Sequence, residues 1–255
     1  MKYGLIGKTL KHSISPEIHR LFGTADYFLK ELTVDEVAIY LDHGDFSGLN
    51  VTIPYKKTVI PFCTGLSQNA LRCNSVNTLI RGEDGTLFGD NTDYDGFLYM
   101  AHQAGISFFG QKVVILGSGG AGETVAAAVK DAGAGEIVMV SRKATATRYT
   151  DTEKYLDADI LVNCTPVGMY PHSGEAPLKL QAFSRLKGVL DLIYNPLKTR
   201  LLRDAAALCI PHANGLMMLV EQARRSEELF LRKKIPQERN AAVYAKAEAL
   251  IRSKK

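Results

Sequence analysis

The stretch from Val113 to Val129 reads VVILGSGGAGETVAAAV. Its first four residues are the aliphatic run of a buried strand, and its alanine-rich end is typical of a helix. The letters between them, GSGGAG at 117–122, place glycines with the spacing G-x-G-x-x-G where the strand would end. A second apolar run follows at 136–140. Together these residues predict a strand, a tight turn, a helix and a second, parallel strand.

Each glycine of the motif has its own physical role. Gly117 permits the tight turn, Gly119 lets the backbone approach a pyrophosphate, and Gly122 allows the helix to pack closely on the strand. The amide groups at the helix N-terminus then favour phosphate oxygens. The alternative is a glycine-rich turn without a ligand, but the strand–turn–helix context favours a dinucleotide site. That site comprises Gly117, Ser118, Gly119, Gly120, Ala121 and Gly122.

The residues after the second strand of this unit discriminate between dinucleotides. An NAD site usually has a carboxylate here for the ribose 2′-hydroxyl. This chain has Ser141-Arg142-Lys143 instead, with no acid before Asp151. The Arg142 guanidinium suits a 2′-phosphate, and Lys143 adds a second cation. The alternative is that both are solvated loop cations, but their position favours NADP, bound by Ser141, Arg142 and Lys143.

The rest of the chain alternates apolar runs with segments of helical period, which predicts an α/β fold with largely parallel strands. Strands are expected at 2–6, 26–32, 48–53, 76–82, 86–91, 112–117, 136–140, 159–163, 189–194 and 208–212. Helices are expected at 15–22, 35–44, 93–105, 215–232 and 236–252, and a further helix follows the glycine motif and runs to residue 129. The pair Asp84-Gly85 predicts a hairpin. A chain of 255 residues is near the length at which one core splits into two.

Composition excludes several classes of protein. The hydrophobic share of 46% and charged share of 23% are ordinary for a soluble globular protein. The net charge of +4 comes largely from C-terminal basic segments without interleaved aromatic residues, which argues against a nucleic-acid partner. The cysteines lack metal or redox spacing, so we expect no metal site and a reducing compartment. Without a signal peptide or a bilayer-length apolar run, the protein should be cytoplasmic and have no membrane partner.

Motifs spread along nearly the whole chain carry a further signal. They are HSISPEIH (12–19), GLNVTIPYK (48–56), NSVNTL (74–79), GDNTDYDG (89–96), GSGGAG (117–122), NCTPVGM (163–169), DLIYNPLKTRLL (191–202) and NGLMMLVEQA (214–223). Together they resemble the shikimate dehydrogenases of aromatic amino-acid and chorismate biosynthesis. The resemblance implies two α/β domains with the active site in the cleft between them. We expect a substrate-binding domain at 1–95, with helices at about 225–255 packing back on it, and a Rossmann-type NADP-binding domain at 96–224.

The resemblance also implies an activity and a set of site residues. The activity is the reversible NADPH-dependent reduction of 3-dehydroshikimate to shikimate, a small-molecule substrate, by a monomer or homodimer. The family's catalytic lysine and its partner aspartate fall on Lys56 and Asp93. The substrate-binding positions fall on Ser13, Ser15, Thr52, Lys56, Asn77, Asp93, Tyr194 and Gln222. Further positions on the cofactor side fall on Thr165, Val167, Gly215 and Met218.

Physical reasoning from the residues agrees with the catalytic pair. Pro54 must end the strand that precedes Lys56, and ligands sit at the carboxyl edge of open α/β sheets. Asp93 also follows a predicted strand. An ammonium group can donate a proton to the alkoxide that develops during ketone reduction, and Asp93 would position that ammonium. The alternative for any lysine is surface solvation, which we assign to Lys57.

The serine pair suits a small anion. Ser15 is predicted as the N-cap of the helix at 15–22, with Pro16 at the first helical position and Glu17 in the first turn. Ser13 lies two residues earlier, so both hydroxyls can face the same way. A helix N-terminus also favours a carboxylate. The alternative is that Ser15 only caps the helix, and Asn77 could equally be a turn residue.

The chain departs from the family pattern in three places. Asn74-Ser75 stands where the family usually has Gly-Ala, Ser141-Arg142-Lys143 stands where it commonly has Asn-Arg-Thr or Asn-Arg-Ser, and residues 22–48 form a shorter region. Two alternatives to the main interpretation follow. One is a quinate/shikimate dehydrogenase that uses NAD or both cofactors. The other is a non-catalytic sensor of NADP or shikimate, although such a protein would not need Lys56 and Asp93.

Overall fold

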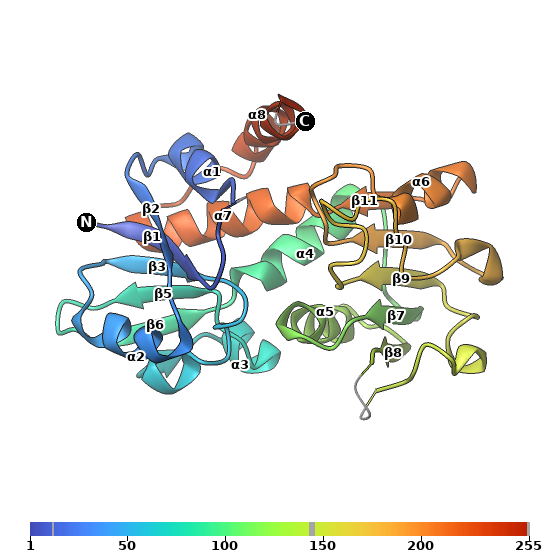
Figure 1. The fold of residues 1–255 in the computed structure, drawn as a ribbon, viewed down its shortest axis with the longest axis horizontal. Coiled ribbons are helices and arrows are strands. Elements are labelled where there is room, and N and C mark those ends of the chain that lie inside the picture. The colour runs from blue at the N-terminus through green and yellow to red at the C-terminus, as the bar shows by residue number, and fades with distance from the viewer. Residues whose placement is uncertain (12, 143–145, 254–255) are drawn as a thin grey trace. The chain divides into compact units, whose positions relative to one another are not determined.

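The structure is a computed structural model that describes residues 1–11, 13–142 and 146–253. The chain forms two compact units (Figure 1). The first comprises Met1–Asp95 and Val220–Ala247, and the second comprises Gly96–Leu219 and residues 248–253. Each unit contains one β-sheet with helices packed on it, so the predicted α/β fold is confirmed.

The first unit has a six-stranded sheet with the order β2-β1-β3-β5-β6-β4. Its strands are β1 (Tyr3–Gly7), β2 (Tyr27–Glu31), β3 (Gly48–Val51), β4 (Gly65–Leu66), β5 (Thr78–Arg81) and β6 (Leu87–Asp90). β1 runs parallel to β2 and β3, whereas β5 is antiparallel to both β3 and β6. The hairpin predicted from Asp84-Gly85 is therefore present, and Gly85 has the positive φ of 84° that its turn needs.

The helices of the first unit cover both faces of this sheet. They are α1 (Ser15–Phe22), α2 (Val34–His43), α3 (Gln68–Cys73), the start of α4 (Thr92–Gln103), most of α7 (Leu216–Leu231) and most of α8 (Arg239–Ser253). Ile6, Leu49 and Val51 pack in one core with Val37 and Leu41 of α2. The alternate strand residues Tyr3 and Leu5 pack in a second core with Phe230 of α7. This alternation is the period of two that a sheet buried on both faces requires.

The second unit has a five-stranded parallel sheet with the order β11-β10-β9-β7-β8. Its elements are the rest of α4, β7 (Lys112–Leu116), α5 (Gly120–Asp131), β8 (Glu136–Val140), β9 (Ile160–Asn163), β10 (Gly188–Asp191), α6 (Arg200–Ala207) and β11 (His212–Asn214). α5 packs on β7 and β8, and α6 packs on β10 and β11. Because the strands are parallel, their carboxyl ends meet at one edge, where the loops after β7, β8, β9 and β10 lie.

The structure corrects two local predictions. The strand expected at 208–212 is wrong, because the Leu208 amide donates to Ala205 and closes the last turn of the unforeseen helix α6, so that the strand begins at His212. Ser15 is the first residue of α1 and not its N-cap. Ile14 occupies the cap position, and Ser13 Oγ accepts from the Ser15 amide at 3.2 Å.

Candidate functional site

Lys56 lies in the turn that follows β3. The preceding Tyr55 is fully buried, and its hydroxyl donates to the Leu32 carbonyl. The carbonyl of Lys56 accepts from the Val76 amide at 2.8 Å. These contacts hold the backbone while the side chain reaches away from it. The Lys56 ammonium donates to the Asp93 carboxylate, and their side chains are only 17% and 12% exposed. The structure therefore brings the two predicted catalytic residues together as a largely shielded ion pair.

Asn77 determines where Asp93 lies. Asn77 is 3% exposed, and its Oδ1 accepts from the backbone amide of Thr92 at 2.8 Å. Thr92 is the first residue of α4, so this bond satisfies one of the amide groups that a helix N-terminus leaves without an intrahelical partner. The Asn77 Nδ2 lies 3.0 Å from Thr92 Oγ1. The predicted substrate residue thus also holds the first turn of the helix that presents Asp93.

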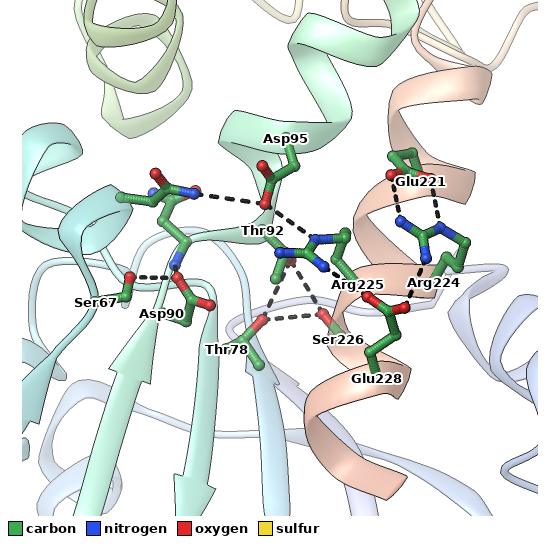
Figure 2. Close-up of polar contacts among 12 residues, drawn as sticks. Ser67, Thr78, Asp90, Thr92, Asp95, Glu221, Arg224, Arg225, Ser226 and Glu228 are labelled. Carbon is green, nitrogen blue, oxygen red and sulfur yellow. Dashed lines mark hydrogen bonds and ion pairs between the residues drawn. The ribbon is translucent and has the colours of Figure 1, made fainter. Parts of the chain in front are cut away.

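A buried cluster of hydroxyl groups lies beside Asn77, and sequence analysis did not foresee it. We call Thr78, Thr92 and Ser226 the hydroxyl cluster, because their Oγ atoms lie within 3.0 to 3.3 Å of one another (Figure 2). Asn50 of β3 adds a donor to Ser226 at 2.8 Å. The cluster ties β3, β5 and the start of α4 to α7. The polar Asn50 within an otherwise apolar strand was its only signal in the sequence.

The face of α7 beyond the hydroxyl cluster carries ion pairs. Arg224 lies between Glu221 and Glu228, and Arg225 contacts both Glu228 and Asp95 (Figure 2). Burial raises the pKa of Asp95, and the charge of Arg225 acts in the opposite direction. Asp95 lies in the first turn of α4, two residues beyond Asp93. The start of α4 is therefore held from the sheet side by Asn77 and from α7 by Arg225.

The remaining predicted substrate residues of the first unit lie on several elements. Ser13 and Ser15 are half-buried at the start of α1, and Thr52 is half-buried directly after β3. The Thr52 amide donates to the Ile6 carbonyl at 3.0 Å, so its backbone extends the β1–β3 ladder. Gln222 is 8% exposed on α7, one helical turn before Ser226. The predicted substrate residues thus come from the start of α1, the end of β3 and the middle of α7.

The glycine motif has the geometry that its spacing predicts. Gly117 has a φ of 101°, and a Cβ on Gly122 would lie 2.1 Å from the Gly117 carbonyl oxygen. Both positions therefore require glycine. A Cβ on Gly119 would meet no atom within 4 Å, so open space lies in front of the α5 N-terminus. Space beside a row of helix N-terminal amides fits a pyrophosphate.

The predicted 2′-phosphate residues follow β8. Ser141 is 6% exposed, and Ser118 of the glycine motif donates to its hydroxyl at 2.9 Å. The Ser141 amide donates to the Thr147 carbonyl at 3.0 Å. Arg142, the next residue, is exposed. Lys143, the third predicted residue, lies outside the described residues.

Thr165 and Val167 lie in the loop after β9, and a buried polar group holds them. Asn163 Oδ1 accepts from the Thr165 amide at 3.0 Å and from its hydroxyl at 2.7 Å. Asn163 Nδ2 donates to Asp191 at 3.0 Å, and Asp191 accepts from the Thr199 hydroxyl at 2.6 Å. We call Asn163, Asp191 and Thr199 the Asp191 network. Sequence analysis missed it, although a polar residue ends each of two apolar strands.

The other predicted residues of the second unit lie after β10 and at the start of α7. Tyr194 is half-buried, and burial raises the pKa of its phenol, which keeps the hydroxyl neutral. A Cβ on Gly215 would lie 2.0 Å from the Leu192 carbonyl oxygen, so packing alone requires glycine there. Met218 is 9% exposed on the first turns of α7.

The part of the chain that the structure describes contains no group of three or more His, Cys, Asp or Glu side chains able to hold a metal ion. None of its helices combines the length and apolar character needed to cross a bilayer. Burial raises the pKa of Cys63 to about 11 and that of Cys164 further, which disfavours their reactive thiolate forms.

Comparison with known proteins identifies the family. Residues 5–79 match the family described as "Shikimate dehydrogenase substrate binding domain". A curated shikimate dehydrogenase (NADP(+)) of Clostridium perfringens is 33% identical over 248 residues, which cover 89% of this chain and 91% of the relative.

Solved structures agree with this match. The chorismate mutase/shikimate 5-dehydrogenase fusion protein from Clostridium acetobutylicum is similar with a TM-score of 0.91 and 35% identity, over 98% of each chain. Shikimate 5-dehydrogenase of Thermus thermophilus, solved in complex with NADP(H) and shikimate, has a TM-score of 0.84 at 30% identity, over 97% of this chain and 99% of that one. The resemblance seen in the motifs is confirmed, and the chain belongs to the shikimate dehydrogenase family.

Proposed function

We propose that this protein is a shikimate dehydrogenase that reduces 3-dehydroshikimate to shikimate reversibly with NADPH. The shielded Lys56–Asp93 ion pair carries the proposal, because it is a proton donor held next to the start of a helix in a unit of the expected family. The relatives named above act on shikimate, which supports the choice of substrate. In this proposal the first unit binds the substrate and the second unit binds NADP.

Lys56 and Asp93 carry out the proton chemistry. During reduction, negative charge develops on the carbonyl oxygen, and the Lys56 ammonium stabilises it and donates a proton. In the reverse direction the neutral amine takes the hydroxyl proton of shikimate. Asp93 orients the ammonium and accepts a hydrogen bond from a substrate hydroxyl. Ser13, Ser15, Thr52, Asn77, Tyr194 and Gln222 supply the short polar groups that a small trihydroxy carboxylate needs.

The second unit holds the cofactor. The amides of Gly119, Gly120 and the following residues of α5 bind the pyrophosphate, and Arg142 binds the 2′-phosphate, with Ser141 and Lys143 beside it. Thr165, Val167, Gly215 and Met218 form the wall on the nicotinamide side. When bound, NADPH supplies the hydride. The open space in front of Gly119 and the absence of a carboxylate between Val140 and Asp151 support NADP binding.

The setting of the enzyme follows from the same family. We propose a cytoplasmic protein that acts on a small molecule, without a nucleic-acid or membrane partner, as a monomer or homodimer. Size-exclusion chromatography with light scattering decides between these two states.

Turnover with a matrix of substrates tests the proposal. Shikimate and quinate are each supplied with NADP⁺ and with NAD⁺, and reduced cofactor is measured by its absorbance. We expect turnover of shikimate with NADP⁺ to exceed the other three combinations. Comparable turnover of quinate, or a preference for NAD⁺, indicates the quinate/shikimate enzyme instead. Binding of NADP or shikimate without any turnover indicates the sensor.

A further inference from the structure

Asp191 is a fully buried carboxylate that the proposed reaction does not use. It is the last residue of β10 and is 0% exposed. Three donors converge on it. Oδ1 accepts from Asn163 Nδ2 at 3.0 Å and from the Ile193 amide at 3.1 Å, and Oδ2 accepts from Thr199 Oγ1 at 2.6 Å. Asp191 therefore joins the loop after β9, the segment after β10 and the start of α6.

Asn163 carries the effect of this carboxylate into the loop after β9. Its Nδ2 is directed by Asp191, which leaves Oδ1 to accept both donors of Thr165. Thr165 Oγ1 in turn accepts from the Val167 amide at 3.2 Å. A continuous chain of hydrogen bonds therefore runs from Asp191 to both loop residues assigned to the nicotinamide side.

The segment after β10 depends on Asp191 in the same way. Thr199 is the N-cap of α6, and its hydroxyl accepts from the Leu202 amide at 3.3 Å. The Ile193 carbonyl accepts from the Gly215 amide at 3.1 Å. The carboxylate thus restrains both ends of the segment that contains Tyr194.

The charge of Asp191 is buried among neutral groups. Among residues 1–11, 13–142 and 146–253, no ion pair involves Asp191, and burial raises its pKa to about 6. Hydrogen bonds from three neutral groups lower the pKa of Asp191 and so oppose the effect of burial. They come from Thr199, the Ile193 amide and Asn163. An uncompensated buried carboxylate lowers stability. The presence of Asp191 is explained if the fold needs one buried group that accepts hydrogen bonds from all three of these donors.

We propose that Asp191 is a positioning residue that holds residues 163–167 and 191–199 in the conformation that binds NADP. The inference rests on the proposed function. It predicts that Asp191→Ala weakens NADP binding about ten- to a hundredfold, the loss expected when hydrogen bonds to a charged acceptor are removed. Asp191→Asn keeps the shape and two acceptor positions, so its loss is smaller, about three- to tenfold.

A matched control lies at the opposite end of the neighbouring strand. Asp159 precedes β9, is 3% exposed and accepts from the Lys112 amide, Arg185 and Lys187. Asp159→Ala also removes a buried carboxylate of this unit, but from the edge away from the loops. Its NADP affinity should stay within about twofold of wild type.

The experiment measures NADP dissociation constants by cofactor fluorescence or calorimetry between pH 5 and 8, with far-UV circular dichroism as the folding check. The neutral amide of Asp191→Asn resembles the protonated acid, so its affinity and that of wild type should converge below pH 6. Titration of the cofactor's own phosphate cancels in this ratio. Hydrogen exchange should accelerate in residues 164–167 and 192–199 of Asp191→Asn and nowhere else to the same extent.

Two results overturn the inference. One is a folded Asp191→Ala protein whose NADP affinity equals that of Asp159→Ala. The other concerns Asp191→Asn and also decides the matter if Asp191→Ala does not fold. In it, the ratio of the NADP affinities of Asp191→Asn and wild type stays constant from pH 5 to 8, and hydrogen exchange is unchanged in residues 164–167 and 192–199. Wild-type turnover with NADP⁺ alongside either result refutes the inference alone. A wild-type protein without NADP affinity refutes the proposed function as well.

Discussion

Lys56 is fixed at its backbone and paired at its tip. The buried ring of Tyr55 and the Val76 amide hold the turn, and Asp93 holds the ammonium. A long, flexible side chain would otherwise lose much conformational entropy on reaching one geometry. Restraint at both ends reduces this entropy loss before the substrate binds. Such restraint suits the proposed role of Lys56, in which it transfers a proton to one defined atom.

Removing the lysine tests its role directly. Lys56→Ala should lower turnover of shikimate by roughly 10²–10⁴, the usual contribution of a positioned proton-transfer group, and leave NADP affinity nearly unchanged. Lys57→Ala, a change in the exposed neighbour, is the control. Asp93→Asn should also slow turnover. Because the two act as a pair, the double variant should lose less than the product of the single losses. Near-normal turnover of Lys56→Ala removes it from the mechanism.

Arg142 is the residue on which we propose that cofactor preference depends. Hydrogen bonds to a charged group contribute about 1.5–3 kcal/mol, so Arg142→Ala should weaken NADP binding about ten- to a hundredfold and leave NAD binding nearly unchanged. Arg142→Asp should shift preference further, because it repels the 2′-phosphate and offers an acceptor to the ribose of NAD. Arg203→Ala, an exposed cation on α6, is the control. The ratio of kcat/KM with the two cofactors is the measurement, and an unchanged ratio in Arg142→Ala contradicts the assignment.

At the scale of elements, the N-terminus of α4 determines the position of Asp93. Asn77 accepts from its first amide, and the Thr92 hydroxyl lies 3.1 Å from that of Ser226 on α7. Arg225 holds Asp95 in the same helical turn. These contacts come from α7 and from the residue that precedes β5, so the orientation of Asp93, the proposed partner of the catalytic lysine, depends on two further elements of the unit.

Substitutions at Asn77 separate its two roles. Asn77→Ala removes the cap of α4 and should lower the free energy of unfolding by about 1–2 kcal/mol, together with turnover. Asn77→Asp keeps the acceptor for Thr92 but loses the Nδ2 donor. It should restore most of the stability, which urea denaturation measures, while the KM for shikimate stays raised. A normal KM in Asn77→Asp shows that the amide donor does not bind substrate.

Elements differ in how well the sequence predicts them, for physical reasons. The turn at 117–122 is predictable because its demands are local: a positive φ at Gly117 and a carbonyl 2.1 Å from any Cβ at Gly122. The departure at Asn74 has a local reason too, since its φ of 44° suits asparagine nearly as well as glycine. The segment directly after α6 was mistaken for a strand because the apolar residues Leu208, Cys209 and Ile210 fit both periods.

At the scale of the whole molecule, two buried groups give opposite dependences of stability on pH. Burial lowers the pKa of His19 despite its 2.6 Å contact with Glu227, so acidification below pH 6.5 costs stability as the unfolded chain gains a proton first. Asp191 acts in the other direction. Its raised pKa means that the folded state binds the proton more tightly than the unfolded chain does. Asp191 therefore lowers the free energy of unfolding progressively as pH rises from 3.8 to about 6.

Comparison with Asp191→Asn isolates the second contribution. A pKa raised from 3.8 to about 6 corresponds to about 3 kcal/mol. The free energy of unfolding of wild type should therefore fall relative to Asp191→Asn by up to that amount as pH rises from 4 to 7, while the His19 contribution cancels. Urea denaturation at several pH values measures the difference. A difference that does not change with pH contradicts a buried, titrating Asp191.

Contacts between distant segments are the part that sequence reasoning from single residues does not reach. Lys56 and Asp93 are separated by 37 positions, and only the family resemblance paired them in advance. Thr78 and Ser226 are 148 positions apart, and neither residue type suggests a partner. Asn163 ends the predicted strand at 159–163, and Asp191 lies inside the predicted strand at 189–194, which in the structure ends at Asp191. Both were visible as polar residues after apolar runs, but their contact depends on strand order, which periodicity does not specify.

The discontinuous first unit has a consequence for synthesis on the ribosome. Its sheet comes from the first 95 residues, yet one face is covered by Phe230, which stacks on Tyr3 with ring centroids 4.8 Å apart. The second unit has its whole sheet once Asn214 has left the exit tunnel. The nascent chain therefore begins the first unit first and finishes it last, with the apolar face around Tyr3 uncovered throughout. A chain stalled before residue 220 presents that face to chaperones.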